Sequence, residues 1–141
     1  MKEVIINGKT VGPNCPVFIV AEIGINHNGS IDIAKEMIRR ANNKGVDAVK
    51  LQKRTIEVVY SKEELDKYRE SPWGTTNREQ KQGLEFGKAE YDEIDRYCKS
   101  LDLIWYASCW DEASVDFIDQ YDPPCYKMAS ATLTDHDLLK Y

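Results

Sequence analysis

Short apolar runs alternate with amphipathic patterns along most of this chain, and this alternation is its most restrictive feature. One run, Val17 to Ile23, is nearly continuous, as in a strand covered on both faces of a parallel sheet. Apolar residues recur at spacings of three and four between the runs, which is typical of helices with one buried face. We therefore predict an α/β fold with four parallel strands at 17–23, 46–52, 103–108 and 125–129.

Several local signals mark where elements begin and end. Asn7-Gly8 lies between two short apolar arms and predicts a tight type I′ hairpin before the main fold. Ser30 can cap the first helix, in which Ile33 is expected on the buried face, and Gly45 can end that helix. The segment 134–137 has a spacing like that of a capping box and predicts a last helix that begins after Thr134.

The loop after the first strand separates two kinds of α/β fold. Residues 22–29 do not fit the glycine-rich GxGxxG loop of a dinucleotide-binding sheet. We therefore predict a partial (β/α)8 barrel, with the hairpin at about 1–13 and barrel units at about 16–141. A complete barrel has eight units and typically about 250 residues, so the first four or so units are expected here.

A polar stretch from about 55 to 88 separates the second and third predicted strands. Connections of this length are uncommon unless they form lids or binding loops. The alternative is a surface excursion built from short helices, and the sequence leaves both possibilities open.

Composition narrows the classes of partner. The 141 residues carry a net charge of −5 and no cationic block, which argues against a nucleic-acid ligand. No apolar run approaches the roughly 20 residues that span a bilayer, and the first ten residues lack the apolar core of a signal peptide. We expect a soluble cytoplasmic protein without a membrane partner. Its cysteines have no paired spacing and are expected to be reduced thiols: Cys15, Cys98, Cys109 and Cys125.

Polar side chains interrupt the apolar runs at the same end of each predicted strand. In a parallel barrel these ends share one face, and that face carries the active site. Two lysines converging there would need an anionic ligand such as a phosphate or a carboxylate. Each lysine taken alone could equally be a rim residue, and Glu22 could simply pair with one of them. The residues are Glu22, Lys50, Gln52, Ser108, Lys127 and Ser130.

Glu22 is the only carboxylate in the first run and is a candidate general acid or base. The loop that follows it, with Asn26, His27 and Asn28, would lie on the same functional face and is a possible lining of the site. The two histidines, His27 and His136, are too far apart in sequence for a local metal motif. We therefore predict no metal ligand among these residues.

Three motifs resemble the N-terminal half of the N-acetylneuraminate (sialic acid) synthase family. They are AEIGINHNG at 21–29, DAVKLQ at 47–52 and YKMAS at 126–130, accompanied by GLEF at 83–86. The resemblance implies a (β/α)8 barrel followed by an antifreeze-like domain, usually in a homodimer. The second half of the barrel and the antifreeze-like domain are not in this sequence.

The resemblance also implies an activity. Members of the family condense phosphoenolpyruvate with the open-chain aldehyde of N-acetylmannosamine or a related sugar, releasing phosphate with the help of a divalent metal, manganese or magnesium. By motif, Lys50, Ser108, Lys127 and Ser130 would hold phosphoenolpyruvate, whereas Glu22 and Gln52 would contact the sugar, with Glu22 also catalytic. The family's metal-binding histidines lie on later strands. This chain reads ASCW at 107–110 where many members have STPF. The phosphate-binding role of Ser108 therefore assumes that its hydroxyl takes the place of the hydroxyl in those members.

Two other interpretations remain open. The same chemistry could act on another aldehyde, as in synthases of legionaminic or pseudaminic acid. Alternatively, the 141 residues could form a non-catalytic half-barrel that self-associates through an unpaired strand. We expect no turnover from these residues alone.

Overall fold

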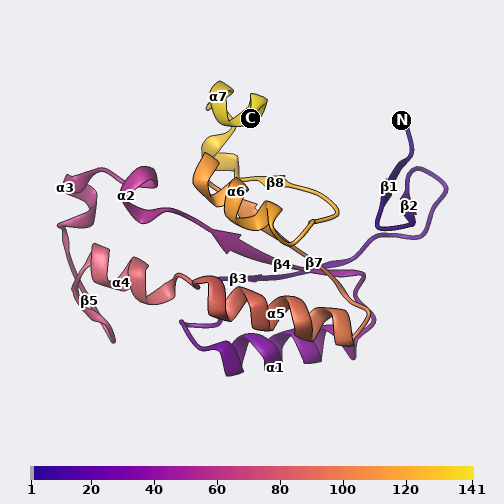
Figure 1. The fold of residues 1–141 in the computed structure, drawn as a ribbon, viewed down its shortest axis with the longest axis horizontal. Helices are drawn as coiled ribbons and strands as arrows, with labels where there is room; N and C mark the ends of the chain where they lie inside the picture. The colour runs from indigo at the N-terminus through magenta and orange to yellow at the C-terminus, as the bar shows by residue number, and fades with distance from the viewer. Residues whose placement is uncertain (1) are drawn as a thin grey trace.

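The four predicted strands form one parallel sheet. The computed structural model describes residues 2–141, and the sheet order is β3-β4-β7-β8, with every neighbouring pair parallel (Figure 1). Each strand follows its neighbour in both sequence and space, with helices in the connections, as in successive units of a barrel. The predicted partial (β/α)8 barrel is thereby confirmed. The strands are β3 (Val20–Gly24), β4 (Ala48–Lys53), β7 (Ile104–Cys109) and β8 (Lys127–Met128).

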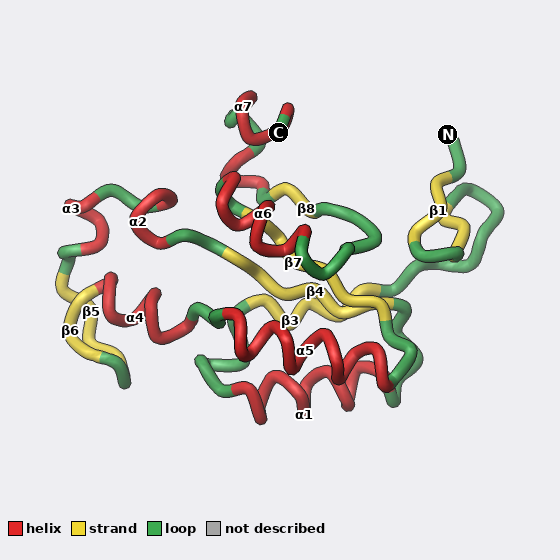
Figure 2. Tube along the Cα trace, in the orientation of Figure 1, coloured by secondary structure: helices red, strands yellow, loops and turns green. Residues whose placement is uncertain are grey.

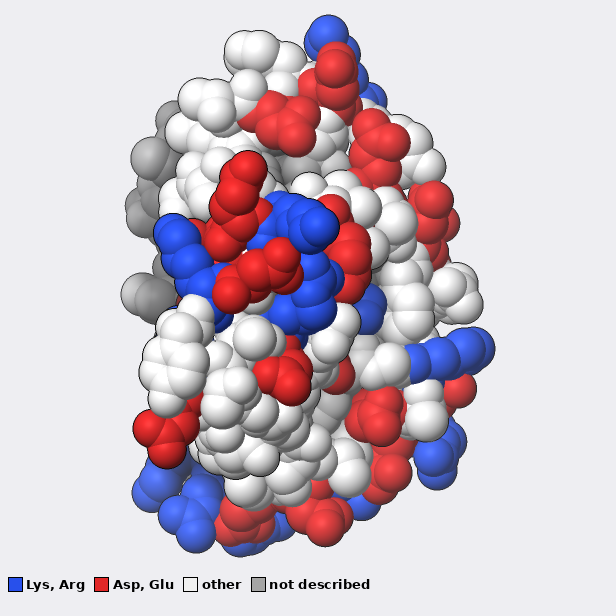
Figure 3. Space-filling model, turned by 90° about the vertical axis from the view of Figure 1, so that its left-hand side faces the viewer, with Lys and Arg blue, Asp and Glu red and all other residues white. Residues whose placement is uncertain are grey.

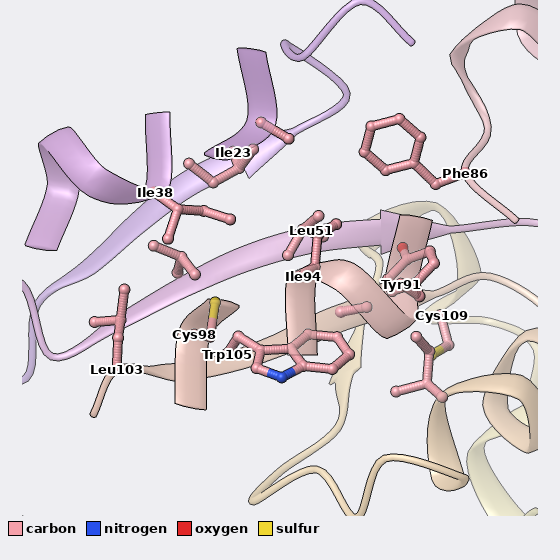
Figure 4. Close-up of a cluster of buried hydrophobic side chains, with 14 residues drawn as sticks. Ile23, Ile38, Leu51, Phe86, Tyr91, Ile94, Cys98, Leu103, Trp105 and Cys109 are labelled. Atoms are coloured by element: carbon pink, nitrogen blue, oxygen red, sulfur yellow. The ribbon is translucent and has the colours of Figure 1, made fainter. Parts of the chain in front are cut away.

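Three helices, α1 (Ile31–Asn42), α5 (Lys88–Ser100) and α6 (Glu112–Asp119), contribute apolar side chains to the cluster that packs against this sheet. Figures 1 and 2 show α1 and α5 side by side along the strands and α6 apart from them, beside β7 and β8. Alternate residues of β4 and β7 point into this layer and meet aromatic and aliphatic side chains from the helices (Figure 4). The opposite face is left to the polar residues of the strands. The buried cluster includes Ile38, Val49, Leu51, Tyr91, Ile94, Cys98, Trp105, Ala107 and Ile118.

Some predicted boundaries are wrong. The first strand begins at Val20, because Val17 is 82% exposed and Ile19 51% exposed, so this part of the apolar run lacks a cover. The fourth strand keeps only Lys127–Met128, which pair with β7 alone. Ile33, which was expected on the buried face of α1, is 44% exposed.

Local signals set most helix and turn ends correctly. The Ser30 hydroxyl accepts a hydrogen bond from the Ile33 amide, and Gly45 has the positive φ of +74° that follows a helix end. The cap of the last helix, α7 (His136–Lys140), is an exception to our prediction. Its N-cap is Asp135, whose carboxylate accepts from the Leu138 amide, because α7 starts one residue later than the Thr134 spacing indicated.

The N-terminal hairpin forms as predicted from strands β1 (Val4–Ile6) and β2 (Lys9–Val11). Asn7 and Gly8 both have positive φ, 47° and 78°, as a type I′ turn requires. Lys9 anchors the hairpin to the sheet, since its Nζ lies 2.7 Å from Oδ1 of Asp47.

The polar stretch between β4 and α5 folds into short elements, as the second of the two possibilities anticipated. Its hairpin turn is held in place by Trp73, whose indole covers Gly83 so closely that a Cβ on Gly83 would lie 2.2 Å from the ring. The elements are α2 (Ile56–Val59), α3 (Lys62–Leu65), β5 (Tyr68–Ser71), β6 (Gly74–Thr76) and α4 (Asn77–Leu84).

Charged side chains gather on the side of the molecule that carries α2 to α4, with positive and negative groups interspersed (Figure 3). Arg78 pairs there with Glu57 at 3.1 Å and with Asp66 at 3.4 Å. Because acidic neighbours balance these cations, they do not form the uniform basic surface that nucleic acids favour. Among residues 2–141, the helices are all too short or too polar to cross a membrane.

Candidate active site at the carboxyl ends of the strands

The polar strand residues lie on one face of the sheet in two rows. Pairing places Glu22 beside Lys50 and Lys50 beside Tyr106, which forms the first row. The second row joins Gln52, Ser108 and Lys127, again by direct pairing of neighbouring strands. Strands are about 4.8 Å apart, so the backbone of the second row spans roughly 10 Å. The face is therefore wide enough for a small anionic metabolite.

Lys50 is the buried cation of the first row. Its side chain is 11% exposed and forms an ion pair with Glu22, whose side chain is 67% exposed. A lysine in this environment needs a negative partner, and the exposed Glu22 can move away when another anion takes its place. Glu22 thus forms the ion pair with a lysine that the sequence offered as one possibility, and its exposed carboxylate also lies beside the predicted site.

In the second row, Ser108 is buried and Gln52 is half-buried, whereas Lys127 is exposed. The Lys127 ammonium donates to the carbonyl of Met128, its own neighbour, and so remains at the edge of the site. Ser130 begins the short 3-10 turn η1 (Ser130–Thr132) and is exposed. The four residues expected to hold an anion thus come from three adjacent strands and the turn after β8, with Lys50 buried and Lys127 at the rim.

A buried ionic network lies next to Gln52, at the end of β4. Nε of Arg54 is 2.6 Å from Oε1 of Glu85, and its Nη1 donates to the Tyr60 hydroxyl at 2.8 Å. Burial raises the pKa of Glu85, and the nearby Arg54 guanidinium opposes that rise. Burial also lowers the pKa of Lys53, which donates to the Phe86 carbonyl at 2.7 Å on the helix-covered side.

Asp111 joins the carboxyl ends of two strands. Its carboxylate accepts from the backbone amide and the hydroxyl of Thr55, at 2.7 and 2.8 Å, just after β4. The same carboxylate caps α6 by accepting from the amide of Ser114 at 2.9 Å. The start of the polar excursion is therefore tied to the start of α6.

The loop after β3 contains the three residues that were predicted as possible lining. Asn26 donates to the Ile23 carbonyl at 3.0 Å, and Asn28 is exposed with a φ of 50°. His27 lies instead in the core, 2% exposed and stacked on Phe86 with ring centroids 3.8 Å apart. Its Nδ1 accepts from the Gly29 amide at 3.1 Å, so His27 shapes the loop from within.

His27 makes the stability of the fold depend on pH. Burial lowers the pKa of His27 from 6.5 to about 4, so the unfolded chain binds a proton here more readily than the folded chain. Stability is therefore expected to fall as the pH drops from about 6.5 to 4, by up to about 3 kcal/mol from this residue. Urea unfolding at pH 7 and pH 4.5 measures the loss.

His27→Asn keeps an acceptor for the Gly29 amide but cannot titrate, and it is expected to remove most of that pH dependence. His136→Asn on the exposed surface of α7 is the control and should leave it intact. Equal pH dependence in the wild type and His27→Asn would show that His27 is not the responsible group.

Two residues near the site were missed by the sequence analysis. Tyr106 occupies the first row beside Lys50. Burial raises the pKa of Tyr106, and the nearby Cys125 and Glu22 raise it further because negative charge on them disfavours the phenolate. Its position two residues before Ser108 was a usable signal, because alternate strand residues share a face. Arg54 has the same spacing, two residues after Gln52, but its ion pair with Glu85, 31 residues away, left no signal in the sequence.

Neither histidine nor any other side chain of residues 2–141 joins a group of three or more His, Cys, Asp or Glu suited to a metal ion. This face is instead equipped with cations, hydroxyls, an amide and one exposed carboxylate. Such a set can bind an anion and move a proton at a neighbouring oxygen.

Comparison with known proteins identifies the family. A profile of the NeuB family matches residues 37–141, which include β4, β7 and β8 with their site residues. The chain belongs to the NeuB family. Human N-acetylneuraminate-9-phosphate synthase is 37% identical to this NeuB-family chain over 135 residues, covering 94% of the chain and 38% of the human protein. The N,N'-diacetyllegionaminic acid synthase of Legionella pneumophila is 31% identical, covering 96% and 39% respectively.

Solved structures of similar proteins share the fold of this NeuB-family chain. The spore coat polysaccharide biosynthesis protein SpsE of Bacillus subtilis matches 99% of the chain and 37% of its own length, with 32% identity and a TM-score of 0.74. The sialic acid synthetase of Leptospira borgpetersenii has a TM-score of 0.83 at 23% identity, covering 99% of this chain and 45% of its own. The chain spans less than half the length of these relatives.

Proposed function

We propose that this chain carries the phosphoenolpyruvate-binding part of a synthase active site. The enzyme would condense phosphoenolpyruvate with an N-acetylated amino sugar of the N-acetylmannosamine type, giving a nonulosonic acid and phosphate. The observation that carries the proposal is the placement of Lys50, Ser108 and Lys127 on one face of three adjacent parallel strands. Relatives named as sialic, legionaminic and pseudaminic acid synthases support the class of product.

Binding of phosphoenolpyruvate would exchange one anion for another. Lys50 already pairs with the exposed carboxylate of Glu22, so a phosphate or carboxylate group of the substrate can replace it without leaving a buried charge alone. The Lys127 ammonium is exposed and bonded only to a backbone carbonyl, so it can turn toward the same anion. The hydroxyls of Ser108 and Ser130 would complete the contacts.

In the proposed reaction, the methylene carbon of phosphoenolpyruvate forms a carbon–carbon bond with the aldehyde carbon of the sugar. Water adds to the enol carbon, and one of its protons passes to the oxygen of the former aldehyde, which becomes a hydroxyl. The bond between the enol carbon and the phosphate oxygen then breaks, so phosphate leaves with the bonding electrons and takes up the second proton, while the carbon becomes a ketone. Glu22, displaced from Lys50, is positioned to exchange a proton with the new hydroxyl or with the attacking water. Gln52 would contact the sugar.

The divalent metal expected from the family does not fit residues 2–141, which offer no suitable group of ligands. Its ligands would have to come from elsewhere in the protein. The residue-level roles given above are therefore confined to binding, orientation and proton transfer.

The identity of the sugar is the finer part of the proposal. We favour an N-acetylmannosamine-type substrate, because the human and mouse N-acetylneuraminate-9-phosphate synthases are each 37% identical to this chain. A precursor of legionaminic or pseudaminic acid is the second candidate, supported by relatives at 31% and 26% identity.

Phosphate release tests the proposed function in the full-length protein that contains this chain. With phosphoenolpyruvate and N-acetylmannosamine, Lys50→Ala is expected to lower the rate by about a hundredfold or more, because it removes a buried cation from the reacting anion. Lys44→Ala, an exposed lysine beyond the opposite end of the barrel strands, should leave the rate unchanged. A Lys50→Ala protein as active as the wild type would refute the assignment. A thiobarbiturate-positive product from residues 1–141 alone would refute our expectation that they lack turnover.

A further inference from the structure

The side chain of Gln52 can be oriented in two ways, and only one of them satisfies its neighbours. With its oxygen toward Arg54, Oε1 accepts from Nη1 at 3.2 Å and shares the single N–H of Nε, 3.0 Å away, with Glu85. The reverse orientation would place the amide NH2 against the N–H groups of the guanidinium, donor against donor. The hydrogen-bonding pattern therefore fixes which end of the amide faces Arg54.

Arg54 is itself held on several sides. Glu85 accepts from its Nε at 2.6 Å and from its backbone amide at 3.3 Å, and the Tyr60 hydroxyl accepts from Nη1 at 2.8 Å. Arg54 is 6% exposed, and the rings of Tyr60 and Trp110 lie near its guanidinium, at 5.8 and 6.0 Å. Because a carboxylate and a hydroxyl fix this buried guanidinium, its N–H groups can in turn fix the orientation of the Gln52 side chain.

The backbone of Gln52 is fixed as well. Its carbonyl accepts from the Tyr91 hydroxyl at 2.9 Å, and its strand pairs with β3 and β7. Since Lys50 and Gln52 are two residues apart in β4, their side chains leave the sheet on the same face. With its oxygen occupied by Arg54, the amide of Gln52 has only its two N–H donors left for a ligand.

We propose that Arg54 is a positioning residue that turns the amide of Gln52 so that its NH2 group faces the active-site mouth. Gln52 then donates a hydrogen bond to an acceptor oxygen of the second substrate, either a hydroxyl or an amide carbonyl. That this substrate is an amino sugar rests on the proposed function. The orientation of the amide does not.

Selective ¹⁵N labelling of glutamine side chains in the 141-residue chain tests the orientation directly. In the wild type, the Gln52 NH2 group is expected to give a dispersed, ordered pair of signals, unlike the exposed Gln120. In two variants, the NH2 group of Gln52 is expected to become mobile, as that of Gln120 is expected to be. Arg54→Met/Glu85→Met removes the pair without leaving a buried charge, and Arg54→Lys keeps the charge but loses the planar fork.

Backbone amide dispersion verifies that each variant is folded, and Arg78→Met, an arginine that pairs with Glu57 and Asp66, is the matched control. The proposal is overturned if the Gln52 amide is as mobile as Gln120 in the wild type. It is also overturned if the amide stays ordered in both folded Arg54 variants.

A second arm measures binding in the full-length protein. Arg54→Lys is expected to weaken N-acetylmannosamine binding about tenfold, the loss of roughly one hydrogen bond, with phosphoenolpyruvate affinity unchanged. Unchanged sugar affinity in a variant with a mobile Gln52 would overturn the sugar-reading role. A wild-type protein that binds neither compound would count against the proposed function, while the NMR result would still decide the role of Arg54.

Discussion

Replacing Gly29 with alanine is expected to lower the free energy of unfolding by about 3 kcal/mol, because the new methyl group meets backbone and the residue has a strained φ. Gly29 has a φ of +70°, and a Cβ there would lie 2.2 Å from the carbonyl oxygen of Gly83. That contact joins the loop after β3 to the end of α4. Urea unfolding followed by far-ultraviolet circular dichroism measures the change.

Gly45→Ala is the matched control for that substitution. Gly45 has nearly the same φ, +74°, but a Cβ there would have no neighbour within 4 Å. Only the backbone strain remains, so a loss of about 1 kcal/mol is expected. Equal losses at Gly29 and Gly45 would mean that the contact between the β3 loop and α4 does not constrain the fold.

Arg54→Met is the second substitution with a large expected effect, a loss of about 3 kcal/mol at neutral pH. It leaves the carboxylate of Glu85 largely buried, with Lys53 4.0 Å away as its remaining cation. Removing both charges in Arg54→Met/Glu85→Met should recover most of the loss, because no buried carboxylate remains. A double variant as unstable as the single one would show that packing, not the unpaired charge, is responsible.

The cost of Arg54→Met should also depend on pH. Burial raises the pKa of Glu85, and without Arg54 that pKa rises further, so the folded protein holds the proton more tightly than the unfolded chain. The stability that the variant loses relative to the wild type should therefore grow as the pH rises above the unfolded-state pKa of Glu85. Comparing the two proteins at pH 4.5 and pH 8 tests this sign, because the effect of His27 is common to both, and a larger loss at the lower pH would contradict it.

Much of the fold follows from local rules that a sequence displays. The Asn7-Gly8 turn, the Ser30 cap and the turn at Gly45 that follows α1 depend on neighbouring residues alone. The true start of β3 at Val20 could not be read from the apolar run, because exposure of Val17 depends on what covers it in space. Burial of His27 under Phe86 is another such case, since 59 residues separate them.

The candidate site shows the same division. Strand alternation predicted that Lys50 and Gln52 share a face, and parallel pairing placed Ser108 and Lys127 in line with Gln52. The network around Arg54 could not be predicted, because Arg54 at the end of β4 contacts Glu85, 31 residues away, and no sequence pattern links the two residues.

Calorimetric titration of the 141-residue chain with phosphoenolpyruvate tests the central claim, that an anion site lies on this face of the sheet. The wild type should bind, and Lys50→Ala/Lys127→Ala should lose that binding. Lys44→Ala/Lys62→Ala, which removes the same charge from two exposed lysines elsewhere, should retain it. Binding that survives in the first variant, or a wild type that does not bind, would contradict the account.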